Sequence, residues 1–140
     1  MARRVIALLG GPPVINEDRK ALEAITPGHL LELSSTGVKK NTDDAANVAP
    51  AFALERDEAG KDIDDAYASG DYVKVGTFHP GQRVYAFVAS GVTVLEGAYL
   101  TSDTAGMLGT SGVAAGVRIA RALEDVTAVV TPTRIRVEIV

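Results

Sequence analysis

Short apolar or alternating stretches recur along the chain from about residue 25 onward, and several follow a glycine-containing turn. The four clearest stretches are residues 29–33, 72–75, 82–88 and 98–100. Two of the turns contain Pro-Gly, which suits the centre of a type II turn because glycine adopts the positive φ required there. Repeated short strands with such turns predict an all-β fold: a small β-barrel or β-sandwich with long loops and at most one or two short helices.

The C-terminal segment has the clearest strand pattern in the chain. Alternation with a period of two predicts a strand over residues 133–140, because successive side chains of a strand point to opposite faces. Its inward face is expected to hold Ile135, Val137 and Ile139, and its outward face Arg134, Arg136 and Glu138. The same pattern predicts inward faces in the two central strands, made by Val73, Val75, Val84, Ala86 and Val88.

Three other stretches have weaker patterns. Residues 92–95 follow a Ser-Gly turn, so a hairpin with the preceding strand is expected, whereas Gly76 is expected to break the strand before it. Residues 113–126 fit helical spacing and an imperfect alternation, and the surrounding β pattern favours a strand over 117–123. Residues 16–25 fit a short helical turn with Asn16 as its N-cap.

The N-terminal segment is apolar over residues 5–9 and then reaches Gly10-Gly11-Pro12-Pro13, which continues neither a helix nor a central strand. Five apolar residues are fewer than the ~7–15 of a secretory signal, so a short strand or arm is expected. No apolar run reaches the ~18–20 residues that span a bilayer. The expected organisation is an N-terminal arm and hinge over residues 1–24, followed by a single β-rich domain over residues 25–140.

Composition narrows the possible functions. The 140 residues suit one domain, and the scarcity of aromatic residues (5%) implies a core of Val, Ile, Leu and Ala. A net charge of −4 argues against broad nucleic-acid binding, which needs a basic surface. The absence of cysteine excludes disulfides, thiol catalysis and the usual structural zinc sites.

Candidate catalytic and metal-binding groups lack the expected spacing. Six acidic residues cluster between positions 57 and 71 without the order of a calcium loop, so a solvated loop is favoured: Asp57, Glu58, Asp62, Asp64, Asp65 and Asp71. His29 and His79 each lie beside a Pro-Gly turn, and no further ligand set supports a metal pair or an acid–base dyad. No Gly-x-Ser-x-Gly elbow or phosphate-binding loop is present. We therefore expect no catalytic residue, no metal and no cofactor.

Protein contact is the better hypothesis for the remaining features. The loops over residues 55–71 and 102–116 are long enough to provide contact surfaces. The N-terminal arm is expected to add as a strand along a neighbouring edge, where main-chain hydrogen bonds give affinity. Its candidate interaction residues are Arg3, Arg4, Val5, Ile6, Ala7, Leu8 and Leu9, with the Arg3–Arg4 doublet suited to an acidic protein surface.

Five blocks of the sequence resemble one known family. Residues 25–33 read I-T-P-G-H-L-L-E-L, residues 51–55 A-F-A-L-E and residues 60–71 G-K-D-I-D-D-A-Y-A-S-G-D. Residues 78–84 read F-H-P-G-Q-R-V, and residues 134–140 read R-I-R-V-E-I-V. In this order the blocks resemble the head decoration, or capsid cement, proteins of tailed bacteriophages, and the resemblance extends over residues 25–140.

The resemblance implies a β-tulip-like fold and a structural role without catalysis. Such a protein binds the outer surface of an icosahedral head, contacts the major capsid protein, forms homotrimers and reinforces the expanded shell. It is found in the virion, and in the host cytoplasm during assembly, with no nucleic-acid or membrane partner. Two alternatives remain open: a small β-barrel domain that binds a ligand or assists an enzyme, and another phage structural protein such as a tail component.

Overall fold

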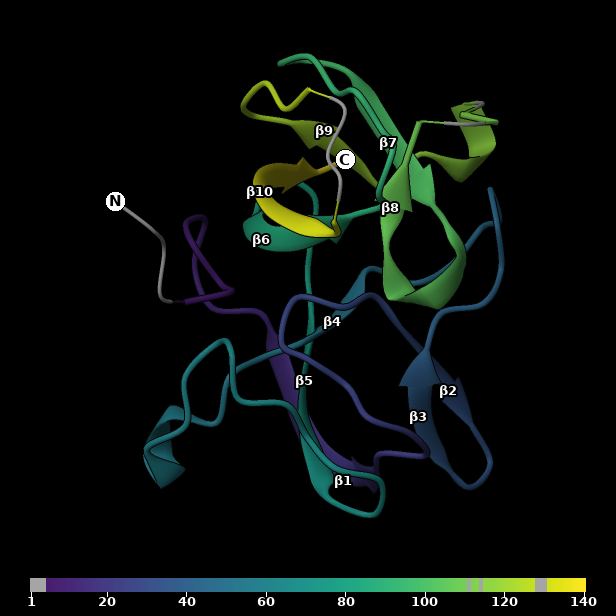
Figure 1. Cartoon of the computed structure of the whole chain (residues 1–140). Coiled ribbons are helices and arrows are strands. Elements are labelled where there is room, and N and C mark those ends of the chain that lie inside the picture. Colours follow the sequence, from purple (N-terminus) through teal and green to yellow (C-terminus); the bar gives the residue numbers. More distant parts are fainter. Residues whose placement is uncertain (1–4, 111, 114, 128–130) are drawn as a thin grey trace.

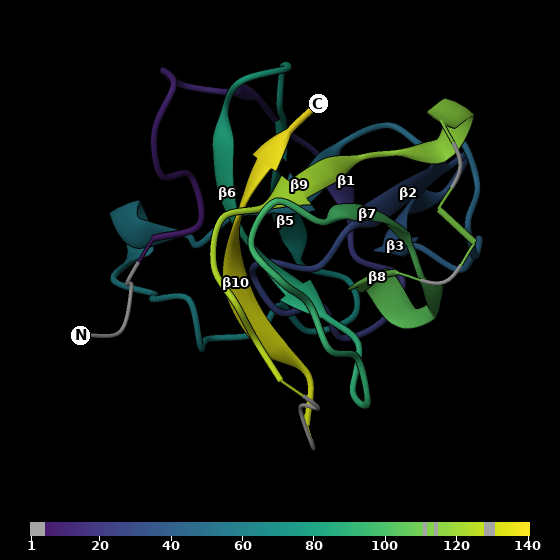
Figure 2. The same ribbon diagram turned by 90° about the horizontal axis from the view of Figure 1, so that it is seen from above.

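The computed structural model describes residues 5–110, 112–113, 115–127 and 131–140, and it is built from short strands (Figures 1 and 2). The strands are β1 (Val14–Lys20), β2 (Leu31–Ser34), β3 (Gly37–Lys40), β4 (Ala51–Ala53), β5 (Tyr72–Thr77), β6 (Arg83–Val88), β7 (Tyr99–Ser102), β8 (Leu108–Gly109), β9 (Ala120–Ala122) and β10 (Thr133–Ile139). Three 3₁₀ turns accompany them: η1 (Asp57–Ala59), η2 (Thr104–Gly106) and η3 (Ala115–Val117). None of the helical segments described is long and apolar enough to cross a membrane.

A closed barrel forms one half of the molecule, in the strand order β10-β6-β8-β7-β9. Strand β10 pairs antiparallel with β6 from Thr133 opposite Val88 to Glu138 opposite Arg83, and it pairs with β9 on its other side. Figure 1 shows this half at the top, with the C-terminal strand in yellow. The predicted inward residues of β6 and β10 are all buried here, so the expected alternation is confirmed.

The other half contains a three-stranded sheet, β1-β5-β4, and the hairpin β2-β3. Its smaller core includes Ile25, Val38, Val73 and Val75, as the alternation predicted for residues 72–75. Leu30 and Phe52 form an isolated bridge that links the hairpin to the sheet, and both side chains pack in the barrel core. The two halves are thus joined through buried apolar contacts.

The short helix expected over residues 16–25 is wrong, because strand β1 extends through Lys20. β1 pairs antiparallel with β5 and forms one edge of its sheet, so residues 14–20 of the expected arm and hinge are members of a sheet. Six of its seven side chains are exposed, which explains why the strand has no apolar alternation. A partner far along the chain stabilises it in place of a buried face of its own.

Two other expectations also fail for reasons of packing. Residues 92–95 form no hairpin with β6; Val94 instead makes an isolated bridge with Val126. Gly76 lies inside β5, where a side chain would meet Leu54 at 2.9 Å. In the ambiguous segment, the strand favoured over 117–123 is confirmed at β9 only, after the η3 turn.

Candidate interaction surfaces

The N-terminal segment, residues 5–9, lies along the chain's own strand β6. The Leu8 N–H donates to the Arg83 carbonyl (2.9 Å), the Arg83 N–H to the Leu9 carbonyl (2.8 Å), and the Tyr85 N–H to the Ile6 carbonyl (2.8 Å). Ile6 has no exposed surface and belongs to the barrel core. The segment expected to add along a neighbouring edge thus pairs here with an edge of its own chain and contributes to its own core.

The segment completes one edge of the barrel. Strand β10 pairs along the whole of one edge of β6, so the other edge is left to β8, the N-terminal segment and the Gly28 carbonyl, which accepts the Phe87 N–H at 3.2 Å. β8 pairs with β6 only at Val88, whereas Ala7 pairs with Val84 near the opposite end. Of the seven candidate interaction residues, Arg3 and Arg4 lie outside the described residues; the other five occupy this edge.

A glutamine holds the turn that follows the segment. The Gln82 amide Nε2 lies 3.3, 3.2 and 3.1 Å from the carbonyl oxygens of Gly10, Gly11 and Pro12. Its Oε1 accepts the His79 N–H at 2.8 Å, which orients the amide group. Gln82 is only 6% exposed, so these hydrogen bonds are shielded from water. The closed turn therefore depends on one buried side chain.

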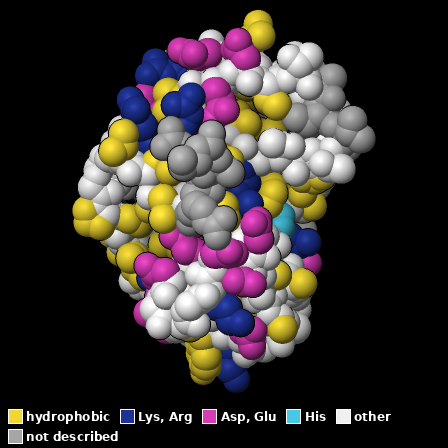
Figure 3. Space-filling view, turned by 60° about the vertical axis from the view of Figure 1, so that its left-hand side comes forward, with side chains coloured by type: hydrophobic (Ala, Val, Ile, Leu, Met, Phe, Trp, Pro, Cys, Tyr) yellow, Lys and Arg dark blue, Asp and Glu magenta, His cyan; other side chains and the backbone are white. Residues whose placement is uncertain are grey.

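The loop over residues 55–71 projects from the molecule and carries seven acidic and two basic residues. Figure 3 looks onto the side from which it projects, and acidic side chains gather across the middle of that face. Lys74 lies 3.3 Å from Asp57 and 3.2 Å from Glu58. The Glu58 side chain and the Lys74 ammonium group lower the pKa of Asp57, and the two carboxylates raise the pKa of Lys74 although burial opposes this.

The remaining acidic groups of this loop mostly shape its turns. The Asp62 N–H donates to Asp65 and the Asp64 N–H donates to Asp62, both at 2.8 Å, while Asp71 accepts the Ala68 N–H at 2.9 Å. In the part of the chain that the structure describes, no three His, Cys, Asp or Glu side chains are placed to share a metal ion. The sequence could not show these roles, since they depend on the loop conformation.

A depression of about 290 Å³ lies between this loop and the start of β5. Its lining includes Arg56, Lys61, Tyr67 and Tyr72. Arg56 already binds Glu17 at 3.0 Å, Glu58 at 3.3 Å and the Tyr72 carbonyl at 2.7 Å. Its guanidinium group thus serves contacts within the chain.

Arg134 joins three distant parts of the chain. Its Nε donates to the Pro27 carbonyl at 3.0 Å, its Nη1 to Asp64 at 3.1 Å, and its Nη2 to the Ile63 carbonyl. The guanidinium group also lies 4.5 Å from the centre of the Phe87 ring. Alternation alone predicted an outward-facing arginine on β10 and contained no signal for these partners.

His29 and His79 lie toward opposite ends of β6 and form no pair. His29 stacks on Phe87 with ring centres 4.6 Å apart, and its Nδ1 accepts the Thr26 N–H at 3.1 Å. Burial, followed by the positive charges of Lys40 and Arg134, lowers the pKa of His29 to about 4. His79 is exposed in the turn before β6. The position of His29 beside its turn agrees with the sequence, but the buried stack was not predicted.

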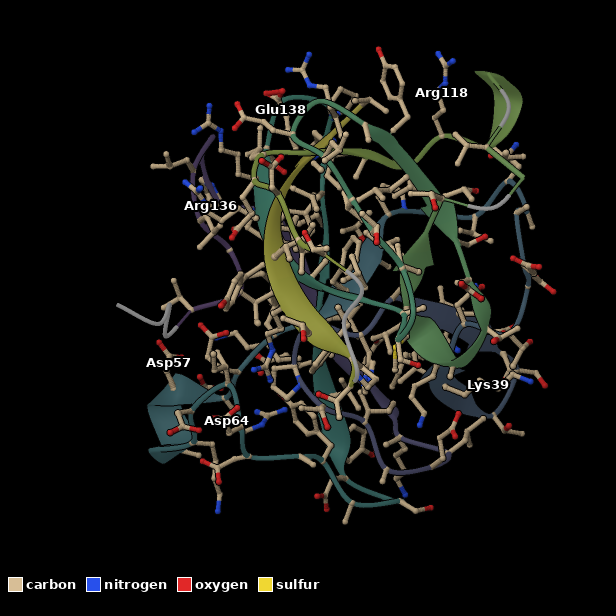
Figure 4. The ribbon with its side chains drawn as sticks, turned by 45° about the horizontal axis from the view of Figure 1, so that its top comes forward. Lys39, Asp57, Asp64, Arg118, Arg136 and Glu138 are labelled. Carbon is tan, nitrogen blue, oxygen red and sulfur yellow. The ribbon has the colours of Figure 1, made fainter. Side chains whose placement is uncertain are left out.

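A row of polar and aromatic side chains crosses the outside of the barrel. The strand registers place Tyr99 opposite Arg121, Arg121 opposite Glu138 and Glu138 opposite Arg83. Arg121 and Glu138 form an ion pair at 2.5 Å, and the Arg118 guanidinium group lies 4.1 Å from the centre of the Tyr99 ring. Figure 4 shows Arg118 and Glu138 at the top of the barrel, far from Asp57 and Asp64 in the projecting loop. Tyrosine and arginine are enriched in protein-binding surfaces.

The described part of the loop over residues 102–116 includes regular structure. It contains η2 and β8, with Leu108 and Gly109 buried. The buried Asn41 amide donates to the carbonyls of Asp43 (2.8 Å) and Asp103 (3.3 Å), which ties this loop to the segment after β3. Residues 111 and 114 lie outside the described part, and the contact role expected for the loop stays a prediction.

No protein-family model matches the chain, and no curated protein sequence matches it either. The resemblance to head decoration proteins therefore depends on the five sequence blocks alone.

Proposed function

We propose that this protein decorates the outside of a tailed-phage head. It binds the major capsid protein, assembles with copies of itself as a homotrimer, and stabilises the expanded shell by contact alone, with no catalytic step. The proposal rests on the sequence resemblance and on one feature of the fold that supports it.

That feature is the mutual contact of the five blocks that carry the resemblance. Ile25 in the first block and Tyr67 in the third form a bridge with hydrogen bonds of 3.1 and 2.7 Å. The Tyr67 hydroxyl donates to the Leu54 carbonyl in the second block at 2.7 Å. These blocks are separated along the chain, so the fold alone brings them together.

The fourth and fifth blocks are connected to the others in the same way. The Gly81 N–H donates to the Ile139 carbonyl at 2.8 Å, and the Ile139 N–H donates to the Gln82 carbonyl at 2.9 Å. Arg134 in the fifth block binds Pro27 of the first and Asp64 of the third. The five blocks therefore contact one another in the fold, and this supports treating them as parts of one pattern.

The proposed mechanism is mechanical. Paired strands hold the exposed surfaces in fixed positions, so that little conformational entropy is lost when the protein binds. The outer row from Tyr99 to Arg83 and the acidic loop over residues 55–71 offer surfaces of different character to the shell and to neighbouring copies. Many copies on one shell act together, so modest individual contacts give strong attachment.

The direct test mixes the purified protein with expanded, undecorated heads and images them by electron microscopy. We expect density at the three-fold positions and increased resistance of the heads to heat. Unexpanded heads are the matched control and should bind less. Bare heads at saturating protein would reject the proposal, and rings or tubes formed by the protein alone would favour a tail component instead.

A further inference from the structure

The N-terminal segment is bound to β6 mainly through its main chain. Three hydrogen bonds of 2.8–2.9 Å join the two, and one side chain, Ile6, fills a fully buried site. Val5 and Leu9 on either side are 47% and 62% exposed. A segment of this kind can bind any identical β6 edge, whether in its own chain or in another copy.

Residues 10–13, which connect the segment to β1, can act as a hinge. Gly10 and Gly11 both have positive φ, +99° and +90°, which lets the chain turn back sharply before β1. The next two residues are Pro12 and Pro13, whose fixed φ makes a short stiff spacer. The reversal is therefore confined to two glycines, and both can adopt extended conformations without steric cost.

Gln82 stabilises the closed conformation of this hinge. Its amide group faces three carbonyl oxygens of residues 10–12, and the Gly10 Cα lies so close that an added Cβ would be 2.8 Å from the Gln82 Cα. These contacts form only while the turn is closed. The Gln82 side-chain contacts that hold the hinge closed are thus distinct from the strand contacts that the segment makes with β6.

We propose that this segment is exchanged between copies: in the homo-oligomer, residues 5–9 of one chain lie on the β6 edge of the next. The inference rests on the proposed self-assembly and names the contact that holds the copies together. Such a contact is directional, since each copy gives a segment and receives one, and directional contacts close into rings such as a trimer.

The free-energy balance of the exchange is set by the hinge. Strand pairing and Ile6 burial are the same in both states, so they cancel. The closed state gains from the high effective concentration of a tethered segment and from the Gln82 contacts. A high local concentration of other copies, in concentrated solution or on a surface, offsets the effective-concentration advantage of the tethered segment. Exchange is therefore expected to increase with protein concentration.

A reversible crosslink tests this directly, because the chain contains no cysteine of its own. Ala7 and Val84 are directly opposite, and the hydrogen bonds on either side identify them as a non-hydrogen-bonded pair, for which Cα atoms are roughly 4.5 Å apart. The double variant Ala7→Cys/Val84→Cys, oxidised in dilute solution, locks each segment onto its own β6. The matched control is Glu32→Cys/Lys39→Cys, an opposed pair within the β2-β3 hairpin.

Light scattering at increasing concentration should show that the oxidised double variant stays monomeric, while its reduced form and both forms of the control assemble. Oxidation at high concentration should produce covalent multimers on a non-reducing gel. Gln82→Glu, which places a carboxylate against the hinge carbonyls, should shift assembly several-fold toward lower concentration.

If the oxidised and reduced double variants assemble equally, the exchange proposal is refuted. It is also refuted if the chains stay monomeric in solution in both states and if oxidation of head-bound protein yields only disulfides within one chain. Head binding is scored separately. A locked chain that assembles normally but no longer binds heads would mean that the segment binds the shell, whereas normal exchange without head binding would overturn the proposed function alone.

Discussion

Replacing His29 with asparagine should flatten the dependence of folding stability on pH between about 6.5 and 4. His29 is 8% exposed, stacks on the Phe87 ring, and is close enough to Lys40 and Arg134 for their positive charges to act on it. Burial and the two cations lower its pKa from 6.5 to about 4. A protonated Nδ1 could also no longer accept the Thr26 N–H.

The sign follows from proton binding by the two states. In the unfolded chain the histidine keeps its ordinary pKa, so as pH falls the unfolded chain binds the proton first. The contribution of His29 is therefore complete above pH 6.5 and is lost as pH falls to about 4. A shift from 6.5 to about 4 corresponds to about 3 kcal/mol in total, of which about 2.5 kcal/mol is lost between pH 7 and pH 4.5.

Urea denaturation at pH 7 and pH 4.5 measures the effect. His29→Asn keeps an acceptor for the Thr26 N–H but does not titrate, so it should lose about 2.5 kcal/mol less than the wild type between the two pH values. At pH 7 it should be about 1–2 kcal/mol less stable, because the ring stack is gone. The exposed His79→Asn is the control and should follow the wild type.

Equal losses of stability in the wild type and His29→Asn would refute this account. So would an NMR titration in which the His29 ring changes protonation near pH 6.5, because the linkage requires the folded-state pKa to lie well below that value. Carboxylates also titrate toward pH 4.5, but they do so equally in both proteins and cancel in the comparison.

Three further substitutions test individual contacts by urea denaturation. Arg134→Lys loses the planar arrangement of donors and should cost about 1–3 kcal/mol, and a neutral result would mean that the three-way junction is not stabilising. Gly28→Ala combines a φ of +102° with neighbours at 3.1 Å and should cost more than Gly81→Ala, which has a φ of +92° and open space; equal costs would exclude crowding at residue 28. Tyr67→Phe removes a buried hydrogen bond of 2.7 Å and should cost about 1 kcal/mol, against little change for the exposed Tyr72→Phe.

The predictable parts of the fold are those in which a strand buries one of its own faces. The alternation in residues 83–88 and 133–139 identifies two adjacent strands of the barrel, β6 and β10, and their inward residues. The Pro-Gly turns mark where two strands follow, since their preferred conformations are local properties of proline and glycine. Burial and turn chemistry leave a signal in the nearest residues, and that signal can be read without any partner.

Strand β1 is an element that local burial and turn chemistry do not predict. Its residues are mostly polar and exposed, and it is a strand because β5 offers an edge for hydrogen bonds. The same limit explains Val94, whose partner is Val126 and not the adjacent strand. Main-chain pairing needs no particular side chain, so a partner distant in the sequence can impose it without leaving a local pattern.

The features of the candidate surfaces also fall into two groups: those that the sequence predicts and those that only the tertiary structure shows. The sequence identified the apolar N-terminal segment, the acidic loop and the positions of both histidines beside turns, because each is a property of neighbouring residues. Only the tertiary structure placed Ile6 in the chain's own core, Gln82 against the hinge and Arg134 between Pro27 and Asp64. Composition and periodicity set the class of fold and its inward faces through local burial, whereas register and long-range packing decided which distant groups meet.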